Sequence, residues 1–183
     1  NGMILAVQYA REQKLPYFGI CLGMQIAVIE YARNIVGLAE ANSGEFDEKC
    51  IHKVIDFMSG QSDEIDKGGT LRLGAYPCRI KEGTTMERCY RTSEIKERHR
   101  HRYEYNNVYR KMLQEKGLIV SGTSPDESLV ETVELTDREF YVGVQYHPEF
   151  KSRPNKPHPL FKGFIEAALK QKKGQFIYMK DCK

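Results

Sequence analysis

Apolar residues along the chain recur at helical spacing in some segments and gather in short runs in others. Residues 3–13 show the helical spacing, and the predicted helix ends before a Lys-Leu-Pro sequence. Residues 15–20 form a short apolar run that predicts a buried strand. The helical spacing returns over residues 24–35, so a second helix is expected to begin directly after Cys21.

The rest of the chain continues to mix the two periods. Strands are predicted over residues 53–58, over 70–80 with a turn, and over 118–123, 129–135 and 141–146. Helices are predicted over residues 107–116 and 159–170, and loops over residues 37–45 and 60–69, whereas 84–90 and the charge-dense 94–105 show no clear period. This mixture of helices and strands favours a layered α/β domain.

Composition narrows the class of protein. The chain has 183 residues, of which 40% are hydrophobic and 29% charged, as expected of one soluble globular domain. Lys+Arg 28 against Asp+Glu 25 gives a net charge of +3, too weak to argue for a nucleic-acid partner. No apolar run approaches the ~20 residues of a membrane span. Five cysteines without framework spacing suggest a reducing compartment, so a cytoplasmic location is expected.

Cys21 is the first candidate for chemistry. It lies at the predicted strand-to-helix junction, with Gly19 and Gly23 on either side, which is the pattern of a nucleophile elbow with Cys in place of Ser. Such a turn is crowded and favours glycine, and a helix N-terminus favours thiolate over thiol. The N–H of Leu22 is expected to point toward a developing oxyanion. Without a base, however, a cysteine in an apolar segment is more often a core residue.

A candidate base lies near the other end of the chain. His147-Pro148-Glu149 follows the predicted strand 141–146, and residues two apart in extended chain point to the same side. A carboxylate there can hold the imidazole in one tautomer, and Pro148 stiffens the pair. A lone histidine is usually structural or on the surface. A cysteine elbow followed far downstream by His-x-Glu is rare by chance and favours nucleophilic catalysis.

These motifs carry a resemblance to a known family. Gly-Ile-Cys-Leu-Gly-Met-Gln at residues 19–25 and Tyr-His-Pro-Glu at 146–149 resemble the class I (triad-type) glutamine amidotransferases. Four further stretches resemble the glutaminase domain of the CTP synthase family, and they cover residues 41–46, 68–74, 97–104 and 145–154. The likeness extends from about residue 2 to 169. The sequence Ser-Arg-Pro-Asn-Lys-Pro, which begins at Ser152, resembles eukaryotic members.

The resemblance implies a fold and a domain division. The expected fold is a three-layer α/β sandwich with a central, mostly parallel sheet, in the flavodoxin-like architecture of class I amidotransferases. Residues 1–170 are expected to form the glutaminase domain, with its N-terminal strands missing from this chain. Residues 171–183 are expected to form a loosely held basic tail.

The resemblance also implies a role for each site residue. Cys21 attacks the side-chain amide of L-glutamine, His147 transfers the proton, and Glu149 orients His147. The residues expected to bind L-glutamine are Leu22, Gly23, Met24, Gln25, Glu45 and Arg102. An acid such as Glu45 suits the α-amino group of the substrate, and a guanidinium such as Arg102 can pair bidentately with its α-carboxylate. Taken alone, Glu45 in a polar loop is a solvated surface acid.

Further expectations concern parts that this chain lacks. In the family, a glycine-rich loop before Met3 supplies the second oxyanion donor, whose loss costs about 10²–10³-fold in rate. An N-terminal synthase domain is expected to bind UTP and to use ATP and Mg²⁺, in a homo-tetrameric enzyme. No cofactor or metal is expected in the glutaminase domain itself, and no nucleic-acid or membrane partner.

Several alternatives remain open. The chain could be another class I glutaminase, a γ-glutamyl hydrolase, or a catalytically silent assembly or regulatory domain. The basic run from Lys96 to Arg102 could bind RNA, although interleaved acids oppose this. His99 and His101 could be metal ligands, but no cysteine or carboxylate at zinc spacing accompanies them. The remaining cysteines, Cys50, Cys78, Cys89 and Cys182, are interpreted as structural or incidental.

Overall fold

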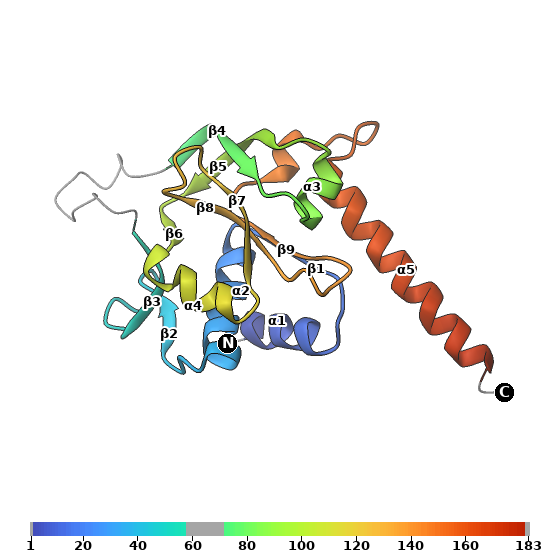
Figure 1. Cartoon of the computed structure of the whole chain (residues 1–183), viewed down its shortest axis with the longest axis horizontal. Helices are drawn as coiled ribbons and strands as arrows, with labels where there is room; N and C mark the ends of the chain where they lie inside the picture. The colour runs from blue at the N-terminus through green and yellow to red at the C-terminus, as the bar shows by residue number, and fades with distance from the viewer. Residues whose placement is uncertain (1, 58–71, 182–183) are drawn as a thin grey trace.

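A six-stranded sheet runs through the molecule, in the order β1-β9-β8-β7-β4-β5 (Figure 1). The computed structural model describes residues 2–57 and 72–181, with side chains described up to residue 173. The strands of this sheet are β1 (Tyr17–Ile20), β4 (Arg72–Ile80), β5 (Glu94–His101), β7 (Ile119–Thr123), β8 (Val130–Glu134) and β9 (Tyr141–Val144). The strands predicted from the apolar runs around residues 15–20, 118–123, 129–135 and 141–146 are therefore confirmed.

The predicted mostly parallel sheet is wrong for the described strands. β1 and β9 pair in parallel, whereas the four other pairings of this sheet are antiparallel. The physical reason lies in the connections. Residues 124–129 join β7 to β8 and residues 135–140 join β8 to β9, and such short segments cannot make the crossover of about a dozen residues that parallel neighbours require.

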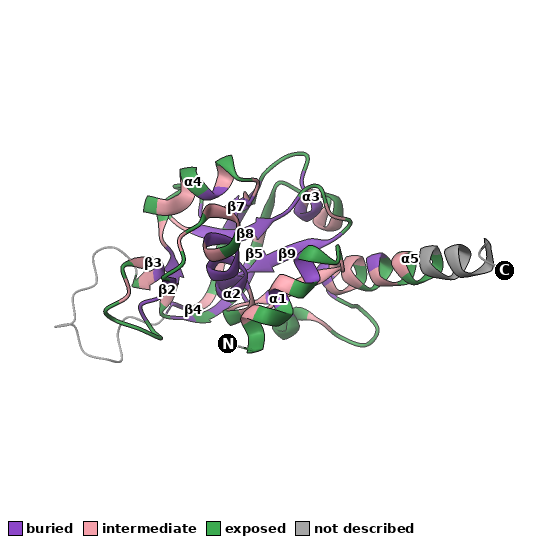
Figure 2. Ribbon diagram, turned by 90° about the horizontal axis from the view of Figure 1, so that it is seen from below, coloured by how far each residue is buried: buried purple, intermediate pink, exposed green. Residues whose placement is uncertain are grey.

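Helices cover both faces of the sheet, which confirms three layers. One apolar cluster contains residues of α1 (Gly2–Glu12) and α2 (Leu22–Tyr31), and the other contains residues of α3 (Thr85–Tyr90) and α5 (Pro159–Asp181). Neighbouring residues of β9 divide between the two, since Tyr141 belongs to the first cluster and Val142 to the second. Helix α2 is buried along most of its length (Figure 2). The nucleophile candidate therefore precedes a central helix.

A second, three-stranded sheet consists of β2 (Ala41–Ser43), β3 (His52–Phe57) and β6 (Tyr103–Tyr105). Only β3 was predicted, because β2 and β6 are too short to show a period. Helix α4 (Arg110–Glu115) confirms the helix expected within residues 107–116. From Arg72 onward, the segment predicted as strands with a turn is the single strand β4, and the predicted loop 60–69 lies outside the described residues.

Helix α5 continues beyond the position where the sequence predicted its end. The expected end was Lys170, but the helix extends to Asp181 and projects away from the body of the molecule (Figure 1). The described helices include none that is long and apolar enough to cross a membrane.

The junction of β1 and α2 depends on a close approach of two backbone segments. A Cβ atom added at Gly19 would lie 2.7 Å from the carbonyl carbon of Gly23 and 2.8 Å from the amide nitrogen of Met24. The nearest atom to a Cβ added at Gly23 is the Tyr17 hydroxyl oxygen, at an ordinary contact distance of 3.6 Å. The sequence analysis expected steric crowding at both glycines. In the structure, only Gly19 is too crowded for a side chain.

We expect Gly19→Ala to destabilise the chain by about 1–3 kcal/mol, because backbone atoms on the facing turn cannot move aside cheaply. Gly23→Ala is the matched control, since its added methyl group meets no close atom, and it should change stability by less than about 0.5 kcal/mol. Urea unfolding followed by circular dichroism measures both variants. Equal stabilities for the two variants would contradict the close-approach argument.

Candidate active site

Cys21 occupies a strained turn between β1 and α2. Its backbone has φ +50° and ψ −104°, a conformation that residues other than glycine rarely adopt. Its N–H donates to the carbonyl oxygen of Val144 on β9 at 2.7 Å. The parallel pairing of β1 with β9 thus continues to the nucleophile itself. The predicted elbow is confirmed in its geometry.

The surroundings of Cys21 raise the pKa of its thiol. Burial raises the pKa of Cys21, the hydrogen bond from the Leu22 N–H lowers it, and the carboxylates of Glu149 and Glu45 raise it further. The N–H at the start of α2 thus favours the thiolate as expected, but burial and two nearby acids outweigh it. A base must remove the proton before this sulfur can act as a nucleophile.

His147 and Glu149 form the predicted pair. The His147 Nδ1 lies 2.6 Å from the Glu149 Oε1. The two residues meet across a 3-10 turn, Pro148–Lys151, rather than along extended chain as predicted. Because a carboxylate can only accept, Nδ1 is assigned the hydrogen, and Nε2 keeps the lone pair that a general base needs.

Strand β5 fixes the position of this pair. The N–H of His147 donates to the carbonyl oxygen of Arg98 at 2.8 Å. The ammonium group of Lys151 donates to the Lys96 carbonyl at 2.7 Å and to the buried Glu97 carboxylate at 3.0 Å. No helix or strand was predicted over residues 94–105, so this support for His147 was not foreseen.

A buried carboxamide reaches the sulfur of Cys21. The Nε2 of Gln145 lies 3.7 Å from Sγ, and Gln145 is fully buried in the segment between β9 and His147. The Nε2 of Gln25 donates to the Gln145 Oε1 at 3.2 Å and to the Tyr103 carbonyl at 3.0 Å. The predicted ligand Gln25 therefore uses its amide N–H groups within the protein. Sequence reasoning missed Gln145, although it lies only two residues before the base.

The other predicted glutamine-binding residues differ in their placement. Glu45 is exposed, and its carboxylate is near enough to Cys21 to influence the pKa of the thiol. Arg102 is exposed in the short connection between β5 and β6. The side chain of Met24 is fully buried, so only its backbone can face a ligand.

Strand β5 contains the charged run for which RNA binding and metal binding were left open. Glu97, His99 and His101 are buried, and the basic residues between them are exposed, which is the alternation of a strand in a sheet. His99 Nδ1 lies 2.8 Å from His101 Nε2, so the two rings contact each other. Over residues 2–57 and 72–181, no group of three or more potential ligands is placed to hold a metal ion.

These histidines belong to a buried polar cluster, defined here as Arg72, His99, His101, Glu104 and Glu131. Arg72 Nη2 donates to Glu131 Oε1 at 2.6 Å, and Arg72 Nη1 lies 3.5 Å from Glu104 Oε1. Burial raises the pKa of Glu104 to about 8, and it lowers the pKa of His99 to about 2. Burial also lowers the pKa of His101, to about 3, so burial disfavours the charged forms of both histidines and of Glu104.

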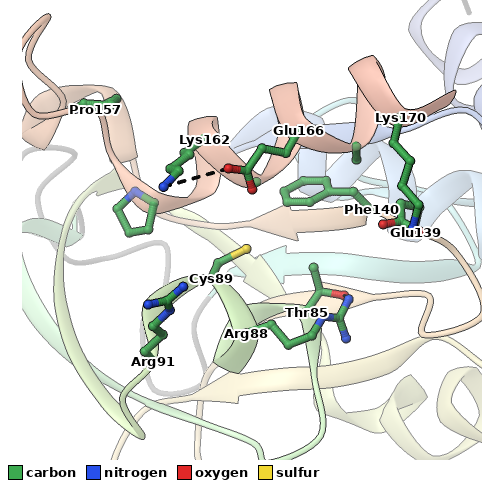
Figure 3. Close-up of a pocket in the computed structure, with 13 residues that line it drawn as sticks. Thr85, Arg88, Cys89, Arg91, Glu139, Phe140, Pro157, Lys162, Glu166 and Lys170 are labelled. Carbon is green, nitrogen blue, oxygen red and sulfur yellow. Dashed lines mark hydrogen bonds and ion pairs between the residues drawn. The ribbon is translucent and has the colours of Figure 1, made fainter. Parts of the chain in front are cut away.

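A cavity of about 450 Å³ lies apart from these residues, between α3 and α5 (Figure 3). None of Cys21, His147 and Glu149 lines it. Its two acids are each within 4 Å of a lysine, because Lys162 lies 3.8 Å from Glu166 and Lys170 lies 2.8 Å from Glu139. The cavity thus offers no arrangement for the chemistry expected of Cys21.

Comparisons with known proteins agree with this geometry. The family model described as "Glutamine amidotransferase class-I" matches residues 1–167. The CTP synthase of Caldanaerobacter subterraneus subsp. tengcongensis is 58% identical over 94% of this chain and 32% of its own length. That of Staphylococcus saprophyticus is 57% identical over 92% of this chain and 32% of its own length. The chain therefore spans about a third of these relatives.

A solved structure is similar to the whole fold. The glutaminase domain of Trypanosoma brucei CTPS with bound acivicin matches with a TM-score of 0.87 and 39% identity, over 92% of this chain and 66% of that one. Both curated relatives are bacterial and more similar in sequence than this trypanosomal domain, so they give no support to the predicted eukaryotic resemblance. The family match, the elbow at Cys21 and the His147–Glu149 pair agree: the chain belongs to the class I glutamine amidotransferases.

Proposed function

We propose that this chain is the glutaminase domain of a CTP synthase and hydrolyses L-glutamine to glutamate and ammonia through a thioester on Cys21. The observation that carries the proposal is the strained elbow at Cys21, combined with the 2.6 Å contact between His147 and Glu149. The similarity to CTP synthases over 94% of the chain supports the assignment to this enzyme.

The site supplies each step of the hydrolysis. The Nε2 of His147 takes the thiol proton, and the Cys21 sulfur attacks the amide carbon of the substrate. The N–H of Leu22 stabilises the oxyanion, and the imidazolium returns its proton to the leaving nitrogen as the C–N bond breaks and ammonia departs. Water, deprotonated by His147, then attacks the thioester, which releases glutamate and restores the thiol.

Substrate binding uses the charged residues around Cys21. Glu45 pairs with the α-ammonium group of glutamine, and Arg102 pairs with its α-carboxylate. Leu22, Gly23 and Met24 contribute their backbone at the start of α2. Gln25 acts from inside the protein, since its Nε2 is bonded to the Tyr103 carbonyl and to another buried amide.

The longer enzyme supplies the remaining chemistry. Because the chain covers 32% of its relatives' length, we assign the amination of UTP to an N-terminal synthase domain that uses ATP and Mg²⁺ and accepts ammonia from this domain. We further propose a cytoplasmic homo-tetramer. The alternatives differ in what they need and what they hydrolyse. Another class I glutaminase needs a different synthase partner, and a γ-glutamyl hydrolase acts on longer γ-glutamyl chains. A catalytically silent domain hydrolyses neither glutamine nor γ-glutamyl chains.

A diazo-ketone analogue of glutamine should label the chain once, on Cys21. Intact mass and peptide mapping locate the adduct, and excess L-glutamine should block it. Cys21→Ala is the control and should take no label. Equal labelling of Cys50, Cys78 and Cys89 would show that Cys21 is not activated, and the silent-domain alternative would then replace the proposal. Binding of single-stranded RNA with a steep salt dependence would favour the RNA alternative instead.

In the longer enzyme, Cys21→Ala should abolish glutamine-dependent CTP formation and leave ammonia-dependent CTP formation unchanged. The reason is that free ammonia bypasses the thioester. Coupled assays with each nitrogen source measure the two rates. Loss of both activities together would indicate that Cys21 has a structural role.

Arg102→Ala should raise the KM for glutamine by about 10-fold or more, because a charge-assisted pair with the α-carboxylate contributes about 1.5–3 kcal/mol. Arg100→Ala is the matched control, since Arg100 is also an exposed arginine, two residues earlier on β5. Initial rates against glutamine concentration measure both variants, with melting temperature in parallel. A KM that stays constant while stability falls would exclude a substrate role for Arg102.

A further inference from the structure

We propose that Gln145 positions and activates the nucleophile, by donating a side-chain N–H to the Cys21 sulfur and stabilising the thiolate when His147 removes its proton. The inference rests on the proposed role of Cys21. It assigns Gln145 a task separate from substrate binding, because the side chain is fully buried and its oxygen is occupied by another amide.

The orientation of the Gln145 amide follows from a fixed reference point. The backbone carbonyl of Tyr103 can only accept, so the atom of Gln25 that lies 3.0 Å from it must be the donor Nε2. The same Nε2 lies 3.2 Å from the facing atom of Gln145, which must therefore be the acceptor Oε1. This leaves the N–H groups of Gln145 Nε2 toward Sγ, at the 3.7 Å expected for a donor to the larger sulfur atom.

The buried polar cluster also contacts the Tyr103 carbonyl, through His101. His101 Nδ1 lies 3.2 Å from the Tyr103 carbonyl and must be the donor there, which leaves His101 Nε2 as an acceptor. His99 Nδ1, 2.8 Å away, is then a donor. Hydrogen-bond direction is thus determined from His99 through His101 to the Tyr103 carbonyl, and from that carbonyl through Gln25 and Gln145 to Cys21.

A hydrogen-bond donor beside the Cys21 sulfur counteracts the groups that raise the pKa of the thiol. Burial, Glu149 and Glu45 all raise the pKa of the thiol, and the Leu22 N–H opposes them. Gln145 supplies a second N–H that strengthens when the sulfur becomes charged. Its carboxamide is neutral at every relevant pH, so it assists without competing with His147 for the proton.

The test is the pH dependence of Cys21 alkylation by iodoacetamide, with the adduct located by peptide mapping. In Gln145→Leu, which removes the donor, the midpoint of the rate profile should rise by about one pH unit, since a lost hydrogen bond to a charged group disfavours the thiolate. In Gln145→Glu, a carboxylate replaces the donor and the midpoint should rise further. For glutamine hydrolysis, kcat should fall while KM changes little.

Two further variants separate this role from a structural one. Thr132→Val removes a different buried hydrogen bond of the same sheet, 2.8 Å from Ser121, and should lower the melting temperature without moving the midpoint. Gln145→Asn keeps a buried amide but shortens the side chain, so that the amide no longer reaches the sulfur. This variant replaces Gln145→Leu in the test if Gln145→Leu does not fold. A wild-type midpoint in folded Gln145→Leu or Gln145→Asn overturns the inference.

The two proposals fail in different ways. Iodoacetamide alkylation needs no substrate recognition, so it reports on the thiol even if the chain does not bind glutamine. Suppose that the wild type takes the diazo-ketone label on Cys21, but the Gln145 variants keep the wild-type midpoint of the alkylation profile. Only the role of Gln145 is then refuted. If the wild type takes no label, the proposed function is lost.

Discussion

The strained backbone of Cys21 is the constraint on which the rest of the site depends. It exists because Gly19 lets β1 pass within van der Waals contact of the first turn of α2, and because the Cys21 N–H bonds to Val144. The second of these contacts brings two distant parts of the sequence to one point. The carbonyl that receives the N–H directly precedes Gln145, and the base follows two residues later. A single parallel pairing, β1 with β9, therefore places Cys21 beside the segment that contains Gln145 and His147.

Strand β5 is the second organising element, and it works through polar groups on both of its faces. From Lys96 onward, its outer side chains are exposed cations, while its inner side chains are a carboxylate and two histidines. Glu97 on the inner face and the strand backbone bind the segment that contains His147, through Lys151 and the His147 N–H. His101, also on the inner face, contacts the Tyr103 carbonyl, which orients Gln25. Burial of charge is expensive, and the Arg72–Glu131 contact and the Lys151–Glu97 contact offset part of that cost.

Local signals in the sequence predicted the elbow at Cys21, the pairing of His147 with Glu149, and most helices and strands, because each is encoded within a few residues. The sheet direction was mispredicted, although the short connections 124–129 and 135–140 already argued for antiparallel neighbours. Helix α3 was left open, yet its N-cap Thr84 accepts the Glu87 N–H, and the Glu87 carboxylate accepts the N–H of Gly83. The structure of β5 was not predictable from apolar periodicity, since its buried side chains are themselves polar. The raised pKa of Cys21 depends first on burial and then on acids far away in sequence, and no local pattern contains either cause.

The resting thiol is consistent with a nucleophile that reacts only when its substrate is present. Glu45 disfavours the thiolate in the free site, and the same carboxylate is the proposed partner of the substrate's ammonium group. Binding of that cation would cancel the negative charge of Glu45 next to the sulfur. That contribution of Glu45 to the raised pKa of Cys21 would then be removed, while the Gln145 N–H group already lies 3.7 Å from the sulfur. An indiscriminate thiolate would instead react with any electrophile that entered the site.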